Sequence, residues 1–474
     1  MLWVMIRKEC LNNLLELRFL VCGGLCIFLA VVSVVVLRAD LAAKQADYHS
    51  NLEIYRTEAE EYGGYENLAR EGIRVDRPPQ NFQVLFYGTE KTLDRTAVVS
   101  RDFLPGFEGN SAGNPIVLLF PAADMLFIVG VVLSLLAFFI SYDAVAGERE
   151  RGTLKLLMSY PLPRDTLILA KWIGGYLSLA LPFLAALGIS ALLIGISGEI
   201  AFTAEDWQAF VVSGLVSLVL IAVMFSIGLF ISVLVRNSST AILSLLAIWV
   251  LLALIVPNAG PYIAEVVAPI QDAGAVERLI AERTKEINDQ FRQEWGGGGR
   301  GGGRRGGGGR RGMRNMSPEQ RAELFQEMQQ RREALRKQVN KVTEEIIRDY
   351  EQRLRHQVDI ARTLTRLSPV ASYAYANTDI GETGVRHERN LVNGLRAYQR
   401  QFSRYILEQQ ADAVGFGNQE DEDYRIDYMP VFKFRAESLE GRLTARTTDV
   451  LLLVVFAVLF FMAAFISFLR TDIT

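Results

Sequence analysis

The sequence predicts an all-α polytopic membrane protein with six transmembrane helices and a mainly α-helical extracytoplasmic domain that contains a small β element. Hydrophobic residues make up 50% of the chain and gather in blocks. Most blocks approach the roughly 20 residues that cross a hydrocarbon core about 30 Å thick. The six blocks cover residues 19–37, 120–140, 173–196, 210–235, 241–256 and 450–469. The remaining long segments, residues 38–119 and 257–449, are expected to form the domain outside the membrane.

Basic residues in the short loops orient the predicted spans. The loop over residues 141–172 has five Lys or Arg residues, whereas the loop between the third and fourth spans has acidic residues and no Lys or Arg. Basic loops are retained on the cytoplasmic side of a membrane. Both chain termini are therefore expected in the cytoplasm, with residues 38–119 and 257–449 on the opposite side.

The region around the first span is expected to be helical on both sides of the membrane. Residues 1–18 are interpreted as a helix in the inner interface, because Trp3 and three basic residues are typical interface anchors. The alternative is the ragged start of the first span. Apolar residues recur at helical spacing over residues 39–71, so the first span is expected to continue outward. Beyond the break at Pro78 and Pro79, residues 82–88 are interpreted as a short strand.

Two strongly charged helical stretches, residues 272–295 and 318–366, dominate the second outer region. Ser317 as N-cap, Pro318 at the first helical position and Gln320 predict the start of the second stretch. This helix would be about 70 Å long at 1.5 Å per residue. Its apolar stripe requires a partner, which another outer helix or a second copy of the chain could supply.

A tract of Gly and Arg separates these stretches at residues 296–312. Such tracts bind single-stranded RNA, which is one interpretation. The tract has no interleaved aromatic residue and falls on the expected outer side. A disordered linker at the tip of a helical hairpin is therefore preferred, and no nucleic-acid partner is expected.

The sequence contains no residue set that is typical of an enzyme. It has no Gly-x-x-x-x-Gly-Lys-Ser/Thr loop, no His-Glu-x-x-His and no Cys-x-x-Cys, so no catalytic residue, metal or cofactor is expected. His49, His356 and His387 are far apart in sequence and are interpreted as satisfied or exposed side chains. Asp124, near the outer end of the second span, is a membrane-embedded acid. It is either a functional group or a side chain that reaches interfacial water.

A charged motif lies in the cytoplasmic loop at residues 141–172. It reads Glu148-Arg149-Glu150-Arg151-Gly152-Thr153-Leu154, and Pro161-Leu162-Pro163-Arg164 and Lys171 follow it. Acidic residues are favourable near a helix amino terminus, and glycine permits close backbone approach. Its arginines could form ion pairs with a soluble partner. The alternative is that these charges only solvate a membrane loop.

This motif resembles the segment after the second span of type-2 ATP-binding-cassette (ABC) transporter permeases, whose six spans and cytoplasmic termini are also similar. The resemblance implies a non-catalytic permease in a bacterial cytoplasmic (inner) membrane, with a separate ATPase subunit. It implies a homodimer, or a pair with a related permease. It places residues 148–154 at the ATPase interface. The insertion at residues 257–449 resembles a bacterial subgroup with a large extracytoplasmic domain.

Two functions follow from this resemblance. In the first, the chain couples ATP hydrolysis to export of a lipid-like or amphipathic solute. In the second, it is a mechanotransmitter that drives an envelope partner through its outer helices without moving a solute. A membrane sensor with a helical input domain is a third class, which six spans in place of two disfavour.

Overall fold

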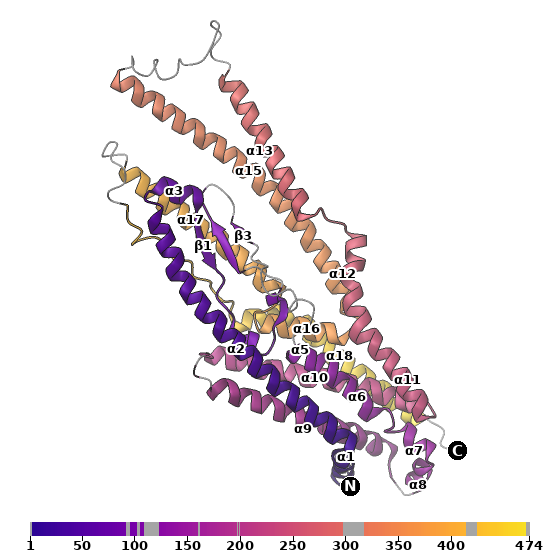
Figure 1. Ribbon diagram of the computed structural model, residues 1–474. Helices are drawn as coiled ribbons and strands as arrows, with labels where there is room; N and C mark the ends of the chain where they lie inside the picture. Colours follow the sequence, from indigo (N-terminus) through magenta and orange to yellow (C-terminus); the bar gives the residue numbers. More distant parts are fainter. Residues whose placement is uncertain are drawn as a thin grey trace. The chain divides into compact units, whose positions relative to one another are not determined.

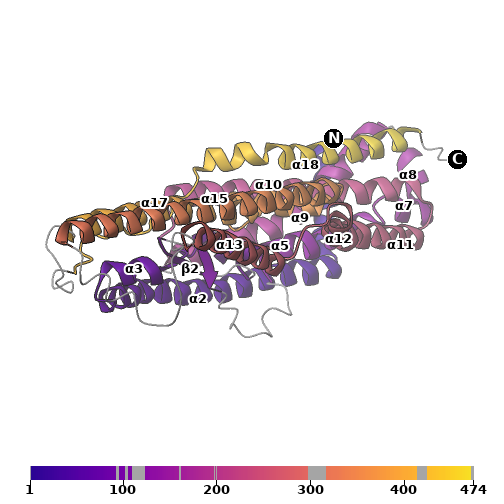
Figure 2. The ribbon, with the colours of Figure 1, turned by 90° about the horizontal axis from the view of Figure 1, so that it is seen from above.

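The computed structural model consists mainly of helices, with one small sheet (Figures 1 and 2). It describes residues 2–91, 95–101, 105–108, 123–159, 162–196, 198, 200–296, 317–413 and 424–470. The chain divides into two compact units, Met1–Ala259 with Thr363–Thr474, and Gly260–Arg362. The Gly/Arg tract that the sequence predicts to be disordered lies, apart from Gly296, outside the described residues.

Six helical segments among the described residues are long and apolar enough to cross a membrane, so the predicted number of spans is confirmed. In chain order they are Phe19–Glu61, Met125–Glu150, Arg164–Ile196, Ala204–Leu234, Ser238–Val267 and Leu439–Arg470. Each includes most of one predicted apolar block. The fold class is therefore the predicted all-α polytopic membrane protein.

Four of the spans are single α-helices, and two contain a π-helical segment. The single helices are α2 (Leu17–Glu61), α9 (Arg164–Ile196), α10 (Ala204–Leu234) and α18 (Leu439–Arg470). The second span comprises α5 (Met125–Phe127), π-helical η3 (Ile128–Leu133) and α6 (Ser134–Ser141), and a turn connects it to α7 (Ala146–Glu150) in the following loop. The fifth comprises α11 (Ser238–Trp249), π-helical η4 (Val250–Ile255) and α12 (Val256–Val267). Single-turn π-segments inside helices are frequent at functional sites.

The amino-terminal residues form a separate helix, α1 (Leu2–Leu15), that packs along α9 (Figure 1). A Cβ atom at Gly174 would lie 2.7 Å from the Cβ of Glu9, so glycine is needed for this close contact. Asn13 Nδ2 donates a hydrogen bond to Ser178 Oγ at 3.3 Å. The predicted helix is confirmed, and its position in the membrane interface stays a prediction.

The small sheet lies outside the residues predicted to form it. Its strands are β1 (Ile73–Asp76), β2 (Thr96–Val99) and β3 (Gly106–Glu108), antiparallel in the order β1-β2-β3. The strand predicted at residues 82–88 is wrong, because short 3₁₀ turns η1 (Asn81–Val84) and η2 (Gly88–Lys91) occupy this segment. Phe82 and Phe86 stack at 6.1 Å, four residues apart, on one side of the turn. A short apolar run does not by itself distinguish a strand from a helical turn.

Part of the first unit lies beyond the apolar blocks and has its own core. We call the described parts of residues 45–108 and 381–434 the distal domain. It contains the sheet, α3 (Tyr65–Glu71) and α17 (Val385–Ala413). Leu68, Val99, Phe402 and Ile406 are fully buried in its hydrophobic cluster. The distal domain is therefore a packed structure that the two long loops build together.

A short helix that the sequence did not predict, α16 (Pro369–Ile380), packs among the spans. Ser368 caps it by accepting a hydrogen bond from Ala371 N at 3.3 Å. Tyr373 is fully buried and donates to Met125 O of the second span at 3.2 Å. A Cβ at Gly130 in η3 would lie 3.1 Å from Val370 Cγ1, so glycine allows this close packing. The region 257–449 thus contributes a helix to the bundle.

The second unit contains α13 (Ala273–Gly296) and most of α15 (Pro318–Thr365). The predicted start of α15 is confirmed by a capping box. Gln320 N donates to Ser317 Oγ at 3.2 Å, and Ser317 N donates to Gln320 Oε1 at 3.1 Å. The 48 residues of α15 form one unbroken helix, about 72 Å long at 1.5 Å per residue.

Candidate functional site

The charged motif in the loop at residues 141–172 folds as a short helical hairpin. Its two helices are α7 (Ala146–Glu150) and α8 (Thr153–Ser159), and we call them the 146–159 hairpin (Figure 1). Gly152 connects them with a φ of +72°, in the left-handed region that favours glycine. A Cβ at Gly152 would meet no other atom within 4 Å. The turn geometry therefore requires glycine, and packing within the chain does not.

Glu148 holds the hairpin to the third span. Its Oε1 lies 2.7 Å from Lys171 Nζ in α9, and the same ammonium group lies 3.4 Å from Glu9 Oε1 in α1. The Lys171 side chain is only 2% exposed. Removing one partner from a buried ion pair leaves an uncompensated charge, which is strongly destabilising. This pair therefore fixes the hairpin, α9 and α1 to one another.

Arg149 and Glu150 hold the hairpin to the fourth and fifth spans. Arg149 Nη1 donates to the carbonyl oxygens of Val233 and Val235 at 3.2 and 2.8 Å, at the carboxyl end of α10. Glu150 Oε2 accepts a hydrogen bond from Ser238 N at 2.9 Å, at the amino end of α11. A cation at a helix carboxyl terminus and an anion at an amino terminus both complement the helix dipole.

The base of the hairpin is also bonded to α10. Ser232 Oγ accepts hydrogen bonds from Val145 N and Ala146 N at 3.0 and 3.1 Å. The same hydroxyl donates to Tyr142 O at 2.8 Å. Leu154 of α8 is 1% exposed and packs in a hydrophobic cluster that includes residues of α9, α10 and α18. The hairpin is thus anchored by both polar and apolar contacts.

The predicted interface residues 148–154 therefore fall into two groups. Glu148, Arg149, Glu150 and Leu154 contact other parts of the same chain, although Glu150 is also exposed, whereas Arg151, Gly152 and Thr153 are exposed and do not hold the hairpin to a span. The exposed surface extends to Lys155 and Leu156, whose side chain is 64% exposed. Contact of this surface with another subunit stays a prediction.

Sequence reasoning assigned Lys171 to the loop and did not identify Ser232. Lys171 lies within α9 between Ala170, which is buried, and Trp172. A charged residue inside an apolar helical pattern is the signal that identifies a buried ion-pair partner. Ser232 carried no comparable signal, because serine is common in membrane helices.

Asp124 caps the first helix of the second span, and its position in the membrane stays a prediction. It is the N-cap of α5, is 4% exposed and accepts hydrogen bonds from Phe127 N at 3.0 Å and Tyr87 N at 2.9 Å. Aspartate at this position satisfies backbone N–H groups that the helix leaves unpaired. The structure therefore gives Asp124 a role in joining the second span to the distal domain.

A cluster of buried charges lies where α16 meets the first turns of α18. Arg446 forms ion pairs with Asp379 of α16 and with Asp449, the latter at 3.3 Å. Arg366 binds the Asp449 carboxylate through two nitrogens, at 2.6 and 3.1 Å. Asp449 is fully buried and the Arg446 side chain is 4% exposed. We call Arg366, Asp379, Arg442, Arg446 and Asp449 the α16–α18 charge cluster.

Arg442 extends this cluster to the fourth span. It donates to the carbonyl oxygen of Ile380, lies 3.2 Å from Glu205 Oε1 in α10 and lies 3.9 Å from Glu382 Oε1. Sequence reasoning missed the cluster because its members come from distant segments. The available signal was the spacing of Arg442, Arg446 and Asp449, which places all three on one helical face.

Among the described residues, no group of three or more His, Cys, Asp or Glu side chains is placed to hold a metal ion.

The fold and the hairpin define a polytopic membrane protein with a rigidly attached, partly exposed loop between its second and third spans. The chain matches the family described as "ABC-2 family transporter protein" over residues 3–473. It belongs to this family, which confirms the resemblance to type-2 ABC transporter permeases. The subgroup with a large outer insertion stays a prediction.

Two relatives are similar over a shorter segment. One is "Probable ABC transporter permease protein NosY" of Stutzerimonas stutzeri, 40% identical over 77 residues, which cover 16% of this chain and 28% of the relative. A protein of the same name from Pseudomonas aeruginosa (strain PAO1) is 43% identical over 72 residues, covering 15% of this chain and 26% of the relative. These matches span little more than a quarter of either relative.

Proposed function

We propose that this chain is a non-catalytic permease subunit that couples ATP hydrolysis by a separate ATPase subunit to export of a lipid-like or amphipathic solute. It would act as a homodimer, or with a related permease, in a bacterial inner membrane with both termini in the cytoplasm. Membership of the ABC-2 family and the multi-pass fold support this proposal. The observation that carries it is the anchoring of the 146–159 hairpin.

In this proposal, the hairpin passes motion of the ATPase to the spans. Three consecutive side chains, Glu148, Arg149 and Glu150, contact α9, α10 and α11. Force applied to the exposed residues therefore reaches three spans through short, specific contacts. Arg151 and Lys155 supply positive charge for an acidic ATPase surface, and Leu156 supplies an apolar anchor.

The opposite end of the bundle offers places where such a motion can change the packing. The π-segments η3 and η4 lie in the second and fifth spans, and both contact α16. Ser368, at the start of α16, donates a hydrogen bond to Leu252 O in η4. Packed elements with two discrete arrangements amplify small displacements. We infer that repacking of α16 against η3 and η4 accompanies the transport step.

The test separates assembly from coupling in nanodisc-reconstituted complexes of this chain with its ATPase. Arg151→Glu is expected to weaken assembly by at least tenfold, because it reverses an exposed charge. Glu148→Gln removes an anchor and is expected to leave assembly within twofold while reducing chain-dependent ATPase activity by fivefold or more. Lys341→Glu, an exposed reversal on α15, is the matched control. Normal assembly and activity in both hairpin variants would contradict the proposal.

Mechanotransmission is the second candidate, and the unbroken length of α15 favours it. The structure also defines a suitable deletion. Gln357 Nε2 donates to Ala268 O at 2.9 Å, so the two arms of this unit are adjacent there. Residues 270–355 can therefore be replaced by a short Gly/Ser linker without removing α16. Retained solute export in this variant would favour the exporter. Loss of the cellular activity of the complex, with intact ATPase assembly and ATP hydrolysis, would favour the mechanotransmitter.

A further inference from the structure

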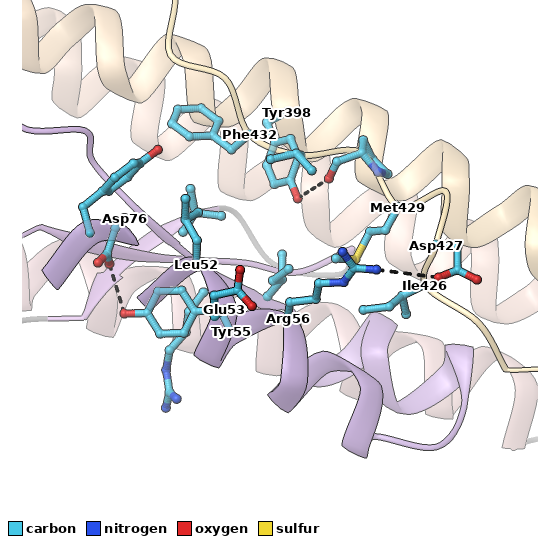
Figure 3. A pocket seen from close by; sticks show the side chains of 16 residues that line it. Leu52, Glu53, Tyr55, Arg56, Asp76, Tyr398, Ile426, Asp427, Met429 and Phe432 are labelled. Atoms are coloured by element: carbon cyan, nitrogen blue, oxygen red, sulfur yellow. Dashed lines mark hydrogen bonds and ion pairs between the residues drawn. The ribbon is translucent and has the colours of Figure 1, made fainter. Parts of the chain in front are cut away.

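The distal domain contains a cavity of about 250 Å³ to which the proposed transport function assigns no role (Figure 3). It lies between α2, β1, α17 and the extended segment at residues 426–432. Four aromatic residues contribute to its lining: Tyr48, Tyr55, Tyr398 and Phe432. Small-molecule sites combine such apolar and aromatic walls with a few placed polar groups.

The walls of the cavity are held in place by hydrogen bonds. Tyr398 donates to Pro430 O at 2.8 Å, and its ring meets that of Phe432 edge to face at 5.6 Å. On the opposite wall, the Asp76 carboxylate accepts from Tyr55 at 3.0 Å (Figure 3), and from Asn51 Nδ2 and Thr96 Oγ1 at 2.6 and 2.7 Å. The cavity is therefore pre-formed, which lowers the entropy lost when a ligand binds.

The charge around the cavity is negative. The lining includes three carboxylates, Glu53, Asp76 and Asp427, and two guanidinium groups. Both guanidinium groups already have carboxylate partners: Arg74 pairs with Glu58 at 2.9 Å, and Arg56 pairs with Glu60 at 3.4 Å and Asp427 at 3.6 Å. The donors to Asp76 are neutral. Glu53 and Asp76 therefore leave uncompensated negative charge at the cavity.

We propose that this cavity binds an organic ammonium cation with apolar substituents, of which a quaternary ammonium group is the simplest form. Aromatic faces attract such cations through their quadrupoles, and the attraction is greater when the cation is desolvated. The carboxylates supply the charge partner. An anion would meet the same negative field, which excludes it. This proposal does not depend on the transport function.

The position of the cavity along α2 indicates that its ligand is a dissolved cation and not the headgroup of a lipid in the bilayer. The apolar part of this continuous helix ends at Leu37, and the cavity residues Tyr48 and Arg56 follow 11 and 19 residues later. At 1.5 Å per residue, these positions lie about 16 and 28 Å further along the helix. A lipid that remains in the bilayer is therefore out of reach.

The test titrates choline, and its uncharged isostere 3,3-dimethylbutanol, into the full chain in phosphatidylglycerol nanodiscs by calorimetry. Choline is expected to bind at least tenfold more tightly than the isostere. Glu53→Gln should reduce this preference by about fivefold, whereas Glu61→Gln, an exposed residue of the same helix outside the cavity, should not change it. Equal affinity for the two probes, or equal effects of the two variants, would overturn the proposal.

Two further experiments test whether the aromatic rings bind the cation and whether the cation is dissolved or part of a lipid. Tyr48→Leu keeps apolar volume at a half-buried position but removes the ring, so choline affinity should fall several-fold while that of the isostere is unchanged. Loss of both affinities, or of neither, contradicts a cation held by aromatic faces. Repeating the titration in phosphatidylcholine nanodiscs should give the same choline affinity. Weaker binding there would show that bilayer headgroups compete, and would overturn the assignment to a dissolved cation.

Discussion

The α16–α18 charge cluster and the surface of α15 use the same residue types in opposite environments. In the cluster, Asp449 is fully buried and the Arg446 side chain is 4% exposed. On α15, Lys337 and Glu333 form an (i, i+4) pair at 2.6 Å with side chains 75% and 64% exposed. The charges are therefore buried and ion-paired in one region, and solvated in the other.

This difference determines what each charge contributes. A buried ion pair is not itself a large source of stability, because desolvation offsets the attraction, but removing one partner is severely destabilising. An exposed pair contributes about 0–1 kcal/mol and is screened by salt. The cluster therefore fixes how α16 packs against α18, whereas the charges on α15 keep the surface of that helix polar and add weak (i, i+4) pairs.

The largest expected effect is in the cluster. Asp449→Ala removes the carboxylate that Arg366 and Arg446 share. We expect a loss of about 3–5 kcal/mol in unfolding free energy, since both guanidinium groups lose a buried partner. Thermal unfolding in nanodiscs measures this. Glu333→Ala on α15 is the matched control, and equal effects of the two variants would remove the distinction between the regions.

The next effect depends on pH and concerns His387 in the distal domain. This side chain is 4% exposed, its Nε2 has no hydrogen-bond partner, and its ring lies 4.9 Å from that of Phe434. Burial, with a further contribution from Arg77, lowers the pKa of His387 to about 4. As pH falls below the usual histidine pKa of about 6.5, the unfolded chain binds the proton first.

Stability is therefore expected to fall between pH 6.5 and 4, by up to about 3 kcal/mol, and this contribution is constant above that range. Burial raises the pKa of Glu90 and of Glu388, which face the same Arg77, so both carboxyl groups act in the opposite direction. The difference between the wild type and His387→Phe isolates the histidine. His356→Phe, at an exposed position of α15, should keep the wild-type profile. Identical profiles for both variants would contradict the assignment.

A smaller effect is expected where burial is only partial. Lys171→Met leaves Glu148 and Glu9, whose side chains are 18% and 22% exposed, without their shared cation. We expect a loss of about 2 kcal/mol, less than for the cluster because both glutamate side chains are partly exposed. Hydrogen exchange of the 146–159 hairpin should be faster by an order of magnitude or more. Unchanged exchange would mean that this ion pair does not hold the hairpin.

The smallest effect is expected for an exposed ion pair on α15. Lys337→Ala should change unfolding free energy by less than about 0.5 kcal/mol, because an exposed (i, i+4) pair is weak and alanine favours helix. Thermal melts at low and high salt measure it. A loss above about 1 kcal/mol that disappears with added salt would indicate that a partner binds these charges.

Features set by local sequence were predictable. A span requires only an apolar block of sufficient length, and the start of α15 requires only Ser317, Pro318 and Gln320 in order. Features set by distant partners were not. α16 contains Asn377 and Asp379, so nothing local indicates that it packs in a membrane bundle. Asp379 is tolerated there because Arg446, which is far away in sequence, forms an ion pair with it.

Dependence on distant partners also explains why the candidate site was predicted only in part. The motif at residues 148–154 was recognisable, but the direction of each side chain depends on Lys171 and on the ends of α10 and α11. Charge alone indicates exposure, and only the partner positions reveal that Glu148 and Arg149 turn inward. The misassigned strand at residues 82–88 has a different cause, since a short apolar run is compatible with several local structures.

Because adjacent side chains cap two helix ends, the 146–159 hairpin is a suitable place for a fluorescent label. Only Val235, Arg236 and Asn237 separate α10 from α11, and Arg149 and Glu150 hold the two ends of this elbow. A dye attached through Ser159→Cys would sit on the exposed surface of α8, next to the contacts that join the hairpin to three spans. A change in the emission of this dye would report span movements in real time, without a bound solute being identified.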